Sequence, residues 1–335
     1  MDIKILGIDL AKRVFQLHGV DVYGKAILTK KVARKDLLKV IVKLKPCTIA
    51  MEACGSCHYW AREFRKLGHE VKLLPAQHVK AFVKANKNDA NDAEAIVEAS
   101  IRPSMRLVPI KELQHQDIQA IHRSRERLIK QRVALINQIR GTFLEYGVLT
   151  PDSRKRMISG LGALIEDSKD LLTPIIRTLL EEGKIELGEI DKKIEKVESL
   201  LKSIFKENEI CKLLETIPGV GLLTSTAVFG AVVDPNQFKN GRDFSAWLGL
   251  VPAQHSSGGK SRLLGISKRG NPYLRKLIVH GARSRVGVPS LQSKWMAEVE
   301  KRRGRNKAVV AQANKNARII WAVMSGKQEY NANAA

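Results

Sequence analysis

Four acidic residues have the types and the spacing of a metal site that acts on phosphodiesters. Asp9 and Glu52 each follow a short apolar run, and Asp89 and Asp92 stand three residues apart at the start of a predicted helix. Two Mg²⁺ ions need several hard oxygen ligands from different elements, and can then activate an attacking oxygen and stabilise a leaving one. The four residues are therefore candidate catalytic and metal-binding residues, with Mg²⁺ as the expected cofactor and Mn²⁺ as its substitute.

Each carboxylate also has a simpler explanation. Asp89 and Asp92 could charge a helix N-terminus, where an acid contributes roughly 0.3–1 kcal/mol, and Asp9 could be a cap or turn residue. Glu52 is harder to explain in this way, because a carboxylate directly after an apolar strand is desolvated and needs a cation. The order of the four residues and the elements that carry them favour the metal site.

The first third of the chain has the strands and helices that would position these acids. Strand patterns cover residues 3–8, 14–20, 25–32, 48–51 and 71–74, the first three as an antiparallel set. Helical patterns cover residues 35–44, 59–67 and 92–99. We expect an α/β domain over residues 1–110 that carries an RNase H-like metal site, with Asp89 and Asp92 on the same side of their helix.

The charge of the chain indicates a polyanionic partner. Lys and Arg number 58 against 34 Asp and Glu, which gives a net charge of +24 over 335 residues. Such a chain attracts nucleic acid by counterion release. An anionic membrane is disfavoured, because the basic residues recur along the whole length and do not sit in one amphipathic stretch. The length predicts two or three domains.

The apolar runs and the cysteines predict a cytoplasmic protein. We expect no signal peptide before the first strand, and the longest apolar run, residues 222–233, is too short to cross a bilayer. The 4 cysteines are too few for a disulfide framework and indicate reduced thiols.

The middle of the chain is predicted to be a helical spacer over residues 111–210. Residues 118–146 form a long amphipathic pattern that also carries Arg125, Lys130 and Arg132, which either follow a nucleic-acid backbone or form a solvated face. A second stretch from Leu187 to Ile204 has the three-and-four spacing of a coiled-coil seam. The spacing leaves open whether this seam pairs within the chain or between chains, although a dimer is its natural use.

The last third contains two further motifs. Residues 213–224 are predicted to form a helix-hairpin-helix-like unit, in which Gly219 and Gly221 either aim backbone N–H groups at a phosphate or form a structural turn. Ser256 and Ser257 then lie in a predicted glycine-flanked loop, with basic residues around them: Lys260, Arg262, Lys268, Arg269 and Arg275. A serine in such a loop is either a nucleophile in a phosphate-binding nest or an ordinary turn residue.

Motifs at both ends of the chain resemble the DEDD transposases of the insertion-sequence-110 family. They are Gly-Ile-Asp-Leu-Ala-Lys, Met-Glu-Ala and Asn-Asp-Ala-x-Asp-Ala in the first third, and Ile-Pro-Gly-Val-Gly, Leu-Gly-Leu-Val-Pro, Ser-Ser-Gly-Gly-Lys and Ile-Ser-Lys-Arg-Gly-Asn in the last. The resemblance runs from residue 3 to about residue 325. It implies a RuvC-like domain, a coiled-coil spacer, a mainly helical transposase domain over residues 211–325 that carries a nucleophilic serine, and a tail over residues 326–335.

The resemblance also implies a mechanism and partners. It assigns the metal tetrad to Asp9, Glu52, Asp89 and Asp92, and the nucleophile to Ser257, the serine directly before Gly258, with Ser256 one place away. It implies RNA-guided recombination of donor and target DNA through a phosphoserine, a bridge RNA, and a homo-oligomer built as a dimer of dimers. The candidate nucleic-acid-binding residues are Lys12, Arg125, Lys130, Arg132, Gly219, Gly221, Lys260, Arg262, Lys268, Arg269 and Arg275.

Two other functions use part of the same pattern. A RuvC-like junction resolvase or hydrolytic nuclease would use the four carboxylates with water as the nucleophile, and would not need the serines. A non-catalytic architectural protein would use only the positive charge and the hairpin unit. A covalent protein–DNA adduct distinguishes the recombinase from the nuclease, and metal-independent function would favour the architectural protein.

Overall fold

The computed structural model describes residues 2–83, 88–258, 260–286, 288 and 292–331, without the side chains of Ser257 and Ser261. The chain forms two compact units, Met1–Leu113 and Gln114–Ala335, and each has its own hydrophobic core. The predicted boundaries at residues 210 and 325 stay predictions.

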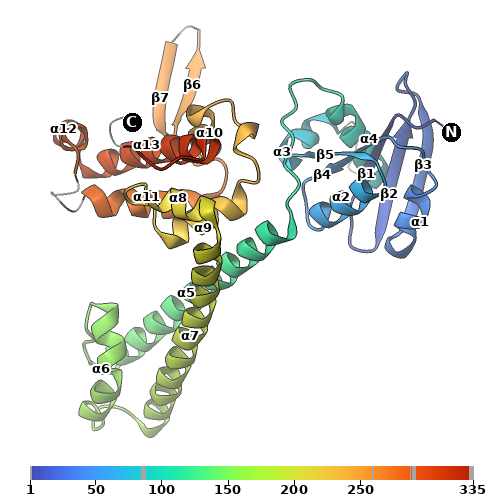
Figure 1. The fold of residues 1–335 in the computed structure, drawn as a ribbon. Coiled ribbons are helices and arrows are strands. Elements are labelled where there is room, and N and C mark those ends of the chain that lie inside the picture. Colours follow the sequence, from blue (N-terminus) through green and yellow to red (C-terminus); the bar gives the residue numbers. More distant parts are fainter. Residues whose placement is uncertain (1, 84–87, 259, 287, 289–291, 332–335) are drawn as a thin grey trace. The chain divides into compact units, whose positions relative to one another are not determined.

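The first unit is built on a five-stranded mixed sheet (Figure 1). Its strands are β1 Ile5–Asp9, β2 Val14–Val20, β3 Ala26–Ala33, β4 Thr48–Glu52 and β5 Glu70–Leu74, in the order β3-β2-β1-β4-β5. β1, β2 and β3 are antiparallel, whereas β4 is parallel to both β1 and β5. The predicted α/β character of this region is confirmed.

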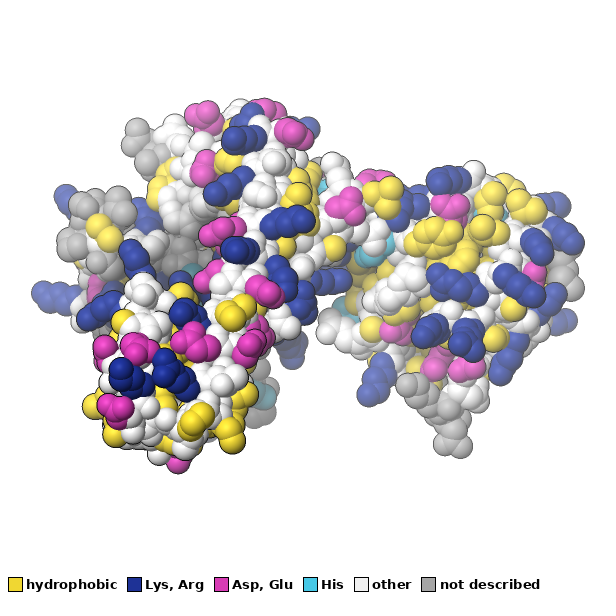
Figure 2. Space-filling model, turned by 90° about the horizontal axis from the view of Figure 1, so that it is seen from below, with side chains coloured by type: hydrophobic (Ala, Val, Ile, Leu, Met, Phe, Trp, Pro, Cys, Tyr) yellow, Lys and Arg dark blue, Asp and Glu magenta, His cyan; other side chains and the backbone are white. Residues whose placement is uncertain are grey.

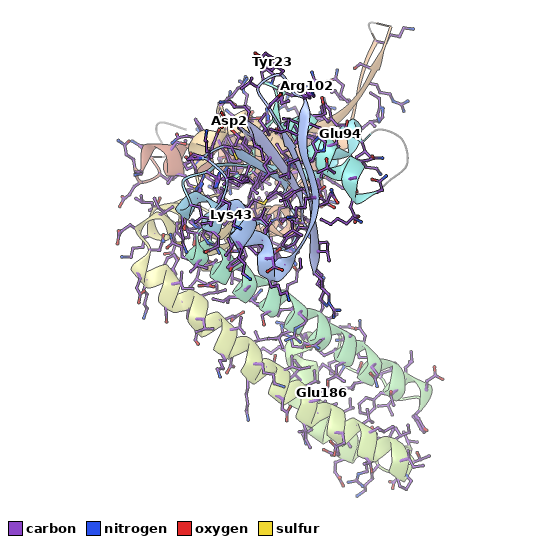
Figure 3. All side chains as sticks on the ribbon, turned by 90° about the vertical axis from the view of Figure 1, so that its right-hand side faces the viewer. Asp2, Tyr23, Lys43, Glu94, Arg102 and Glu186 are labelled. Carbon is purple, nitrogen blue, oxygen red and sulfur yellow. The ribbon has the colours of Figure 1, made fainter. Side chains whose placement is uncertain are left out.

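Helices cover both faces of this sheet, because successive side chains of a strand point to opposite faces. Ile49 and Met51 of β4 pack with α1 Leu37–Ile41 and α2 Cys57–Lys66, after a short turn of helix at Arg34–Asp36. Ala50 packs instead with α3 Ala76–Val79 and α4 Asp89–Ser100, which flank a second turn of helix at Lys80–Phe82. In Figure 3, Glu94 marks the α4 side of the sheet and Lys43 the α1 side.

A glycine in β1 brings α4 close to the sheet. A Cβ atom at Gly7 would lie 2.5 Å from the backbone oxygen of Ala93 and 2.7 Å from Cγ2 of Val97, both in α4. Only a residue without a side chain allows this approach. Gly7 therefore sets where the N-terminal turn of α4, with Asp89 and Asp92, lies relative to the end of β1.

The second unit begins with a long pair of helices, α5 Leu113–Glu145 and α7 Pro174–Glu207, joined through α6 Arg154–Asp167. Leu128 of α5 packs with Ile190 and Ile194 of α7, and Leu187 of α7 joins a neighbouring cluster with Ile136 and Ile139. The predicted long helix is confirmed. At these residues the seam pairs with a helix of the same chain, whereas the expected pairing between subunits stays a prediction.

Two ion pairs reinforce this helix pair. Arg125 Nε donates to Glu198 Oε1 at 2.7 Å, and Arg132 Nη1 donates to Asp191 Oδ1 at 2.6 Å. The arginine side chains are only 18% and 11% exposed. Both arginines therefore serve the packing of α5 against α7.

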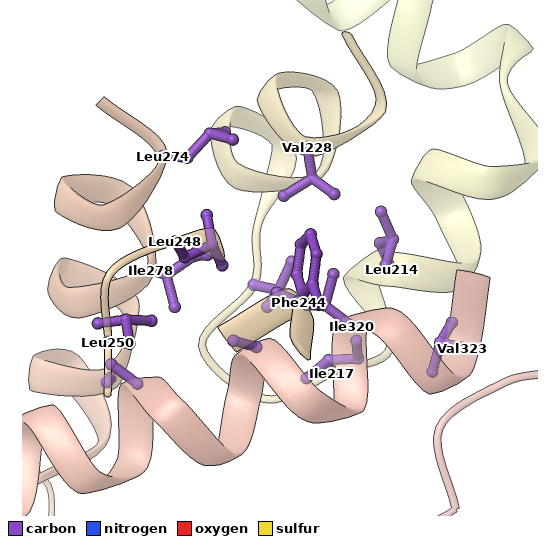
Figure 4. Close-up of a cluster of buried hydrophobic side chains, with 14 of the residues drawn as sticks. Leu214, Ile217, Val228, Phe244, Leu248, Leu250, Leu274, Ile278, Ile320 and Val323 are labelled. Carbon is purple, nitrogen blue, oxygen red and sulfur yellow. The ribbon is translucent and has the colours of Figure 1, made fainter. Parts of the chain in front are cut away.

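A helical body completes the second unit around a single large core (Figure 4). Phe244, Leu214, Ile278 and Ile320, all fully buried, come from four different helices of this core. The elements are α8 Glu209–Glu215, α9 Leu222–Ala231, a turn of helix at Pro235–Gln237, α10 Gly241–Trp247, α11 Pro272–Val286, α12 Lys294–Arg303 and α13 Arg305–Gly326. The mainly helical character predicted for this region is confirmed.

A buried histidine connects the helix pair to this body. His122 of α5 lies within hydrogen-bond distance of Tyr273 Oη through Nδ1, at 2.9 Å, and of Thr226 Oγ1 through Nε2, at 3.0 Å. Burial is the main cause that lowers the pKa of His122 to about 4, and the nearby Arg125 lowers it further. The imidazole is therefore neutral near pH 7.

The serines do not lie in an irregular loop, which corrects the sequence-based expectation. β6 Pro252–Ser257 and β7 Lys260–Ile266 form a two-stranded antiparallel hairpin. Ser257 pairs with Lys260, and Gly258 and Gly259 stand between them in the sequence. A Gly-Gly pair between two strand-length segments is a known hairpin pattern, which the exposed, polar composition of the segments concealed.

Candidate active site

The carboxyl ends of two neighbouring parallel strands carry the first two acids. Asp9 is the last residue of β1 and Glu52 the last residue of β4. Ile8 pairs with Met51 in the parallel register, so the two acids follow at the same edge of the sheet. Adjacent strands lie about 4.8 Å apart. Asp9 and Glu52 therefore lie next to each other on adjacent strands, at the same edge of the sheet.

The other two acids stand in the first turn of α4. Asn88 caps this helix by accepting a hydrogen bond from the backbone N–H of Asn91 at 2.9 Å. The cap fixes where the helix begins, and thus places Asp89 and Asp92 on its first turn. Asp92 is half-buried and Asp89 is exposed.

One pocket of about 840 Å³ brings the four acids together. Asp9, Glu52, Asp89 and Asp92 line this pocket with Ala76, Gln77, Val79, Lys80 and Val83. Lys80 and Gln77 were not singled out from the sequence, because nothing in their spacing relates them to the acids. The close approach of α4 to Gly7 explains why acids from a helix and from two strands share one space.

The negative charge of the acids contributes to a raised pKa at a cysteine beside the pocket. The pKa of Cys54 is raised to about 11, mainly by burial, and then by the nearby Cys57, Glu52 and Asp9. Like charge disfavours a thiolate at this position. Cys54 is therefore a protonated thiol near pH 7.

The donor atoms of the pocket suit a hard divalent cation. All four acids offer carboxylate oxygens, the ligands that Mg²⁺ and Mn²⁺ prefer. Asp89 makes one surface ion pair with Lys31, at 3.7 Å, in which both side chains are 67% exposed, and such a pair is weak. Across the described residues, no three acidic, histidine or cysteine side chains already form a metal-binding group. The four acids fit a divalent metal because they offer carboxylate oxygens and share one pocket. Their side chains would have to move closer together to coordinate it.

The serine hairpin presents polar and basic groups to solvent. Gln254 Nε2 donates to Ser256 Oγ at 2.7 Å, whereas the side chain of Ser257 lies outside the described part of the chain. Lys260 and Arg262 on β7 are exposed. The choice between Ser257 and Ser256 therefore stays a prediction.

The base of the hairpin is rigidly packed. A Cβ atom at Gly249 would lie 2.2 Å from the backbone oxygen of Arg269, and Arg275 Nη1 donates to backbone oxygens of Leu248 and Arg269, at 3.0 and 2.9 Å. These contacts give Arg275 a structural role. Lys268 and Arg269 remain exposed near the hairpin.

The remaining candidate nucleic-acid contacts fall into two groups. Lys12, in the connection between β1 and β2, and Lys130 on α5 are exposed. Gly219, by contrast, packs against α11: a Cβ atom there would lie 2.7 Å from the backbone oxygen of Gly281. Asn316 also donates to the backbone oxygen of Pro218 at 3.2 Å. The turn therefore has a packing role at Gly219, and only Gly221 is exposed, as the N-cap of α9.

Two transposase families match this chain. Residues 6–148 match a family of DEDD transposases related to IS110, and residues 211–297 match the transposase family IS116/IS110/IS902. The first match contains all four acids and the second contains the serine hairpin. The fold and the pocket thus belong to the class of DEDD transposases, which implies an RNase H-like fold for the first unit.

The similar proteins extend over nearly the whole chain. The chain is 46% identical over 337 residues to a transposase for insertion sequence element IS1111A of Coxiella burnetii, covering 99% of this chain and 93% of that protein. It is 38% identical over 326 residues to a transposase for insertion sequence element IS1328 of Yersinia enterocolitica, covering 96% and 97%. The chain belongs to the IS110 family of transposases, and the predicted family is confirmed.

Family membership implies an enzyme that cleaves and rejoins DNA, and suggests the use of a divalent metal. Among the described residues, every helix is too short or too polar to span a membrane.

Proposed function

We propose that this transposase recombines donor and target DNA through a covalent phosphoserine, with a metal held by Asp9, Glu52, Asp89 and Asp92. The observation that carries the proposal is that these four acids line one pocket. Four carboxylates from two strand ends and a helix start share this pocket, and a divalent cation would offset the repulsion between their like charges.

The acids and the serine have separate tasks. The tetrad would hold a divalent cation, which would supply Lewis-acid stabilisation of the negative charge on phosphate oxygens. The Ser257 hydroxyl gives up its proton and forms a bond to the scissile phosphorus, while one phosphorus–oxygen bond to deoxyribose breaks and the released deoxyribose oxygen takes a proton. A hydroxyl of the partner DNA then reverses the step, so no external energy source is needed.

The basic residues of the hairpin support this reaction. Lys260 and Arg262 are exposed on the strand that pairs with the serines. Their charge can offset the negative charge that develops on the phosphate. Exposed Lys and Arg side chains are also spread over the visible surface of the first unit (Figure 2), which supports binding of a guide RNA by this unit.

The guide RNA and the assembly are further parts of the proposal. We infer a bridge RNA that pairs with donor and target DNA, and a homo-oligomer built as a dimer of dimers. The tetrad stands in the first unit and the serine in the second. Two DNA duplexes need several active sites, and a subunit can complete the site of its neighbour.

The test of the chemistry is a covalent adduct. A nicked donor duplex that loses its short leaving strand should trap the phosphoserine, and mass spectrometry of the linked peptide should locate it at Ser257. Asp9→Asn and Glu52→Gln should abolish the adduct, as should chelation of divalent metal. The matched control is Glu98→Gln, an acid of α4 that pairs with Arg102 at 3.7 Å outside the pocket.

The result can contradict the proposal in distinct ways. A link at Ser256 would move the nucleophile by one residue. Cleavage without any covalent protein–DNA link would show that the protein acts as a hydrolytic nuclease. A mixture of Asp9→Ala and Ser257→Ala subunits tests the shared site: activity should recover if one subunit supplies the acids and its neighbour the serine, and should stay absent if both come from one chain.

A further inference from the structure

A groove of about 870 Å³ lies at the base of the serine hairpin, within the second unit. One wall comes from the start of β6 and the end of β7, and the other from α12 and α13. Its lining residues are Leu250, Pro252, Leu264, Gly265, Ile266, Trp295, Asn306, Lys307, Val310, Ala311, Asn314, Lys315 and Arg318. The mechanism proposed above uses none of them.

The groove combines an apolar surface with an aromatic ring. Trp295 is 40% exposed and Leu264 is 43% exposed, although large apolar side chains are usually buried. The other tryptophans of the chain, Trp60, Trp247 and Trp321, all join hydrophobic cores. Contiguous exposed apolar surface of this kind marks a binding site.

The positive charge of the groove favours an anionic ligand. Lys307, Lys315 and Arg318 line it, and none of the described residues that line it is acidic. Lys315 Nζ lies 5.6 Å from the centroid of the Trp295 ring. A second copy of this chain, at a net charge of +24, would meet like charge there. A nucleotide offers the two complementary parts, a flat base for the ring and phosphates for the cations.

We propose that this groove binds one unpaired base of the DNA strand, stacked on Trp295, with the flanking phosphates next to Lys307, Lys315 and Arg318. The inference rests on the proposed function, since it takes the substrate of the serine hairpin as its ligand. Asn306 presents an amide that can hydrogen-bond the edge of the base.

The hairpin also gives the position of this base. Four residues of β6 lie between Pro252, at the groove, and Ser257, and the five residue steps span at most about 17 Å at about 3.3 Å per residue. A DNA strand that follows β6 at about 3.4 Å per nucleotide would place the unpaired base about five nucleotides from the phosphate that the serine attacks.

The test uses the full chain and single-stranded oligonucleotides that carry 2-aminopurine, whose fluorescence is quenched on stacking. Wild-type protein should quench the probe, Trp295→Phe should largely retain the effect, and Trp295→Ala should lose it and bind about tenfold more weakly, because one base–aromatic stack is worth about this factor. Tyr23→Ala removes another exposed aromatic ring, 91% exposed in the first unit, and should change nothing. Lys307→Gln should flatten the salt dependence by about one unit of slope.

Thermal unfolding shows whether Trp295→Ala is folded. If it is not, Trp295→Leu replaces it, because leucine keeps an apolar side chain in the groove without an aromatic ring and should not quench; quenching by Trp295→Leu equal to that of wild type would likewise overturn the proposal. Quenching by Trp295→Ala equal to that of wild type would overturn the proposal. So would a smaller oligomer of Trp295→Ala in sedimentation with unchanged quenching, since the groove would then be a protein interface.

The outcome is separable from that of the proposed chemistry. Stacking that depends on Trp295, in a protein that forms no serine adduct, supports the groove and refutes the nucleophile. A serine adduct in a protein whose quenching is independent of Trp295 refutes only the groove.

Discussion

Gly7 offers a direct test of how the sheet positions the acids. In Gly7→Ala, the new Cβ atom would meet the backbone oxygen of Ala93 at 2.5 Å and Cγ2 of Val97 at 2.7 Å. The Val97 side chain can rotate, but the backbone oxygen moves only if α4 moves. A shift of α4 carries Asp89 and Asp92 away from Asp9.

The expected cost follows from the contact. One methyl group forced into a packed interface typically costs about 1–3 kcal/mol, which for a domain of this size lowers the melting temperature by about 4 °C or more. The loss of activity should exceed the loss of folded protein, because a misplacement of about 1 Å reduces catalysis by a factor of about 100. Thermal unfolding and adduct yield on the nicked donor duplex measure the two effects.

Two controls isolate the cause. Gly55→Ala makes the same change close to Glu52, where nothing lies within 4 Å of the new Cβ atom, and should leave both measurements unchanged. Gly7→Ala combined with Val97→Ala should not recover activity, since the clash with Ala93 persists. A Gly7→Ala protein with wild-type melting temperature and adduct yield would show that α4 is not held against β1 in this way.

Three further predictions concern the second unit. The pKa of His122 is about 4 in the folded protein against 6.5 for an ordinary histidine. Below pH 6.5 the unfolded chain therefore binds a proton that the folded chain does not, and the free energy of unfolding should fall by up to about 3 kcal/mol as the pH drops to 4. Urea midpoints should show this part of the pH dependence for wild type but not for His122→Gln. Arg132→Ala leaves Asp191 without its partner and should cost about 1–2 kcal/mol in urea unfolding, whereas Lys130→Ala should cost almost nothing. Ile194→Asp should lower the melting temperature by separating α7 from α5; unchanged melting with a dissociated oligomer would contradict the pairing within the chain.

The first unit could be predicted closely because its sequence carries local signals. Apolar runs bounded by turns gave all five strands, and the positions of Asp9 and Glu52 followed from the strands they end. That Lys80 would face the acids depends on tertiary packing across the sheet, for which a local pattern contains no information.

The second unit was less predictable because its features depend on which surfaces meet. A seam such as Leu187 to Ile204 has the same spacing whether it pairs within or between chains. The charges of Arg125 and Arg132 indicated nucleic acid until Glu198 and Asp191 were found beside them. Trp295 became informative only when its exposed ring and cationic neighbours were seen in one groove.

The two-stranded hairpin of β6 and β7 has a consequence for when the enzyme can react. In the described part of the chain β6 and β7 pair only with each other. An isolated two-stranded hairpin is marginally stable in water, so this one, which carries the candidate nucleophile at its end, depends on the packing at its base around Gly249 and Arg275. Under the proposed phosphoserine mechanism, part of the DNA-binding energy would fix the hairpin in its reactive geometry. The serine would then react slowly with other phosphodiesters until a duplex is bound, and this would protect the host chromosome from cleavage.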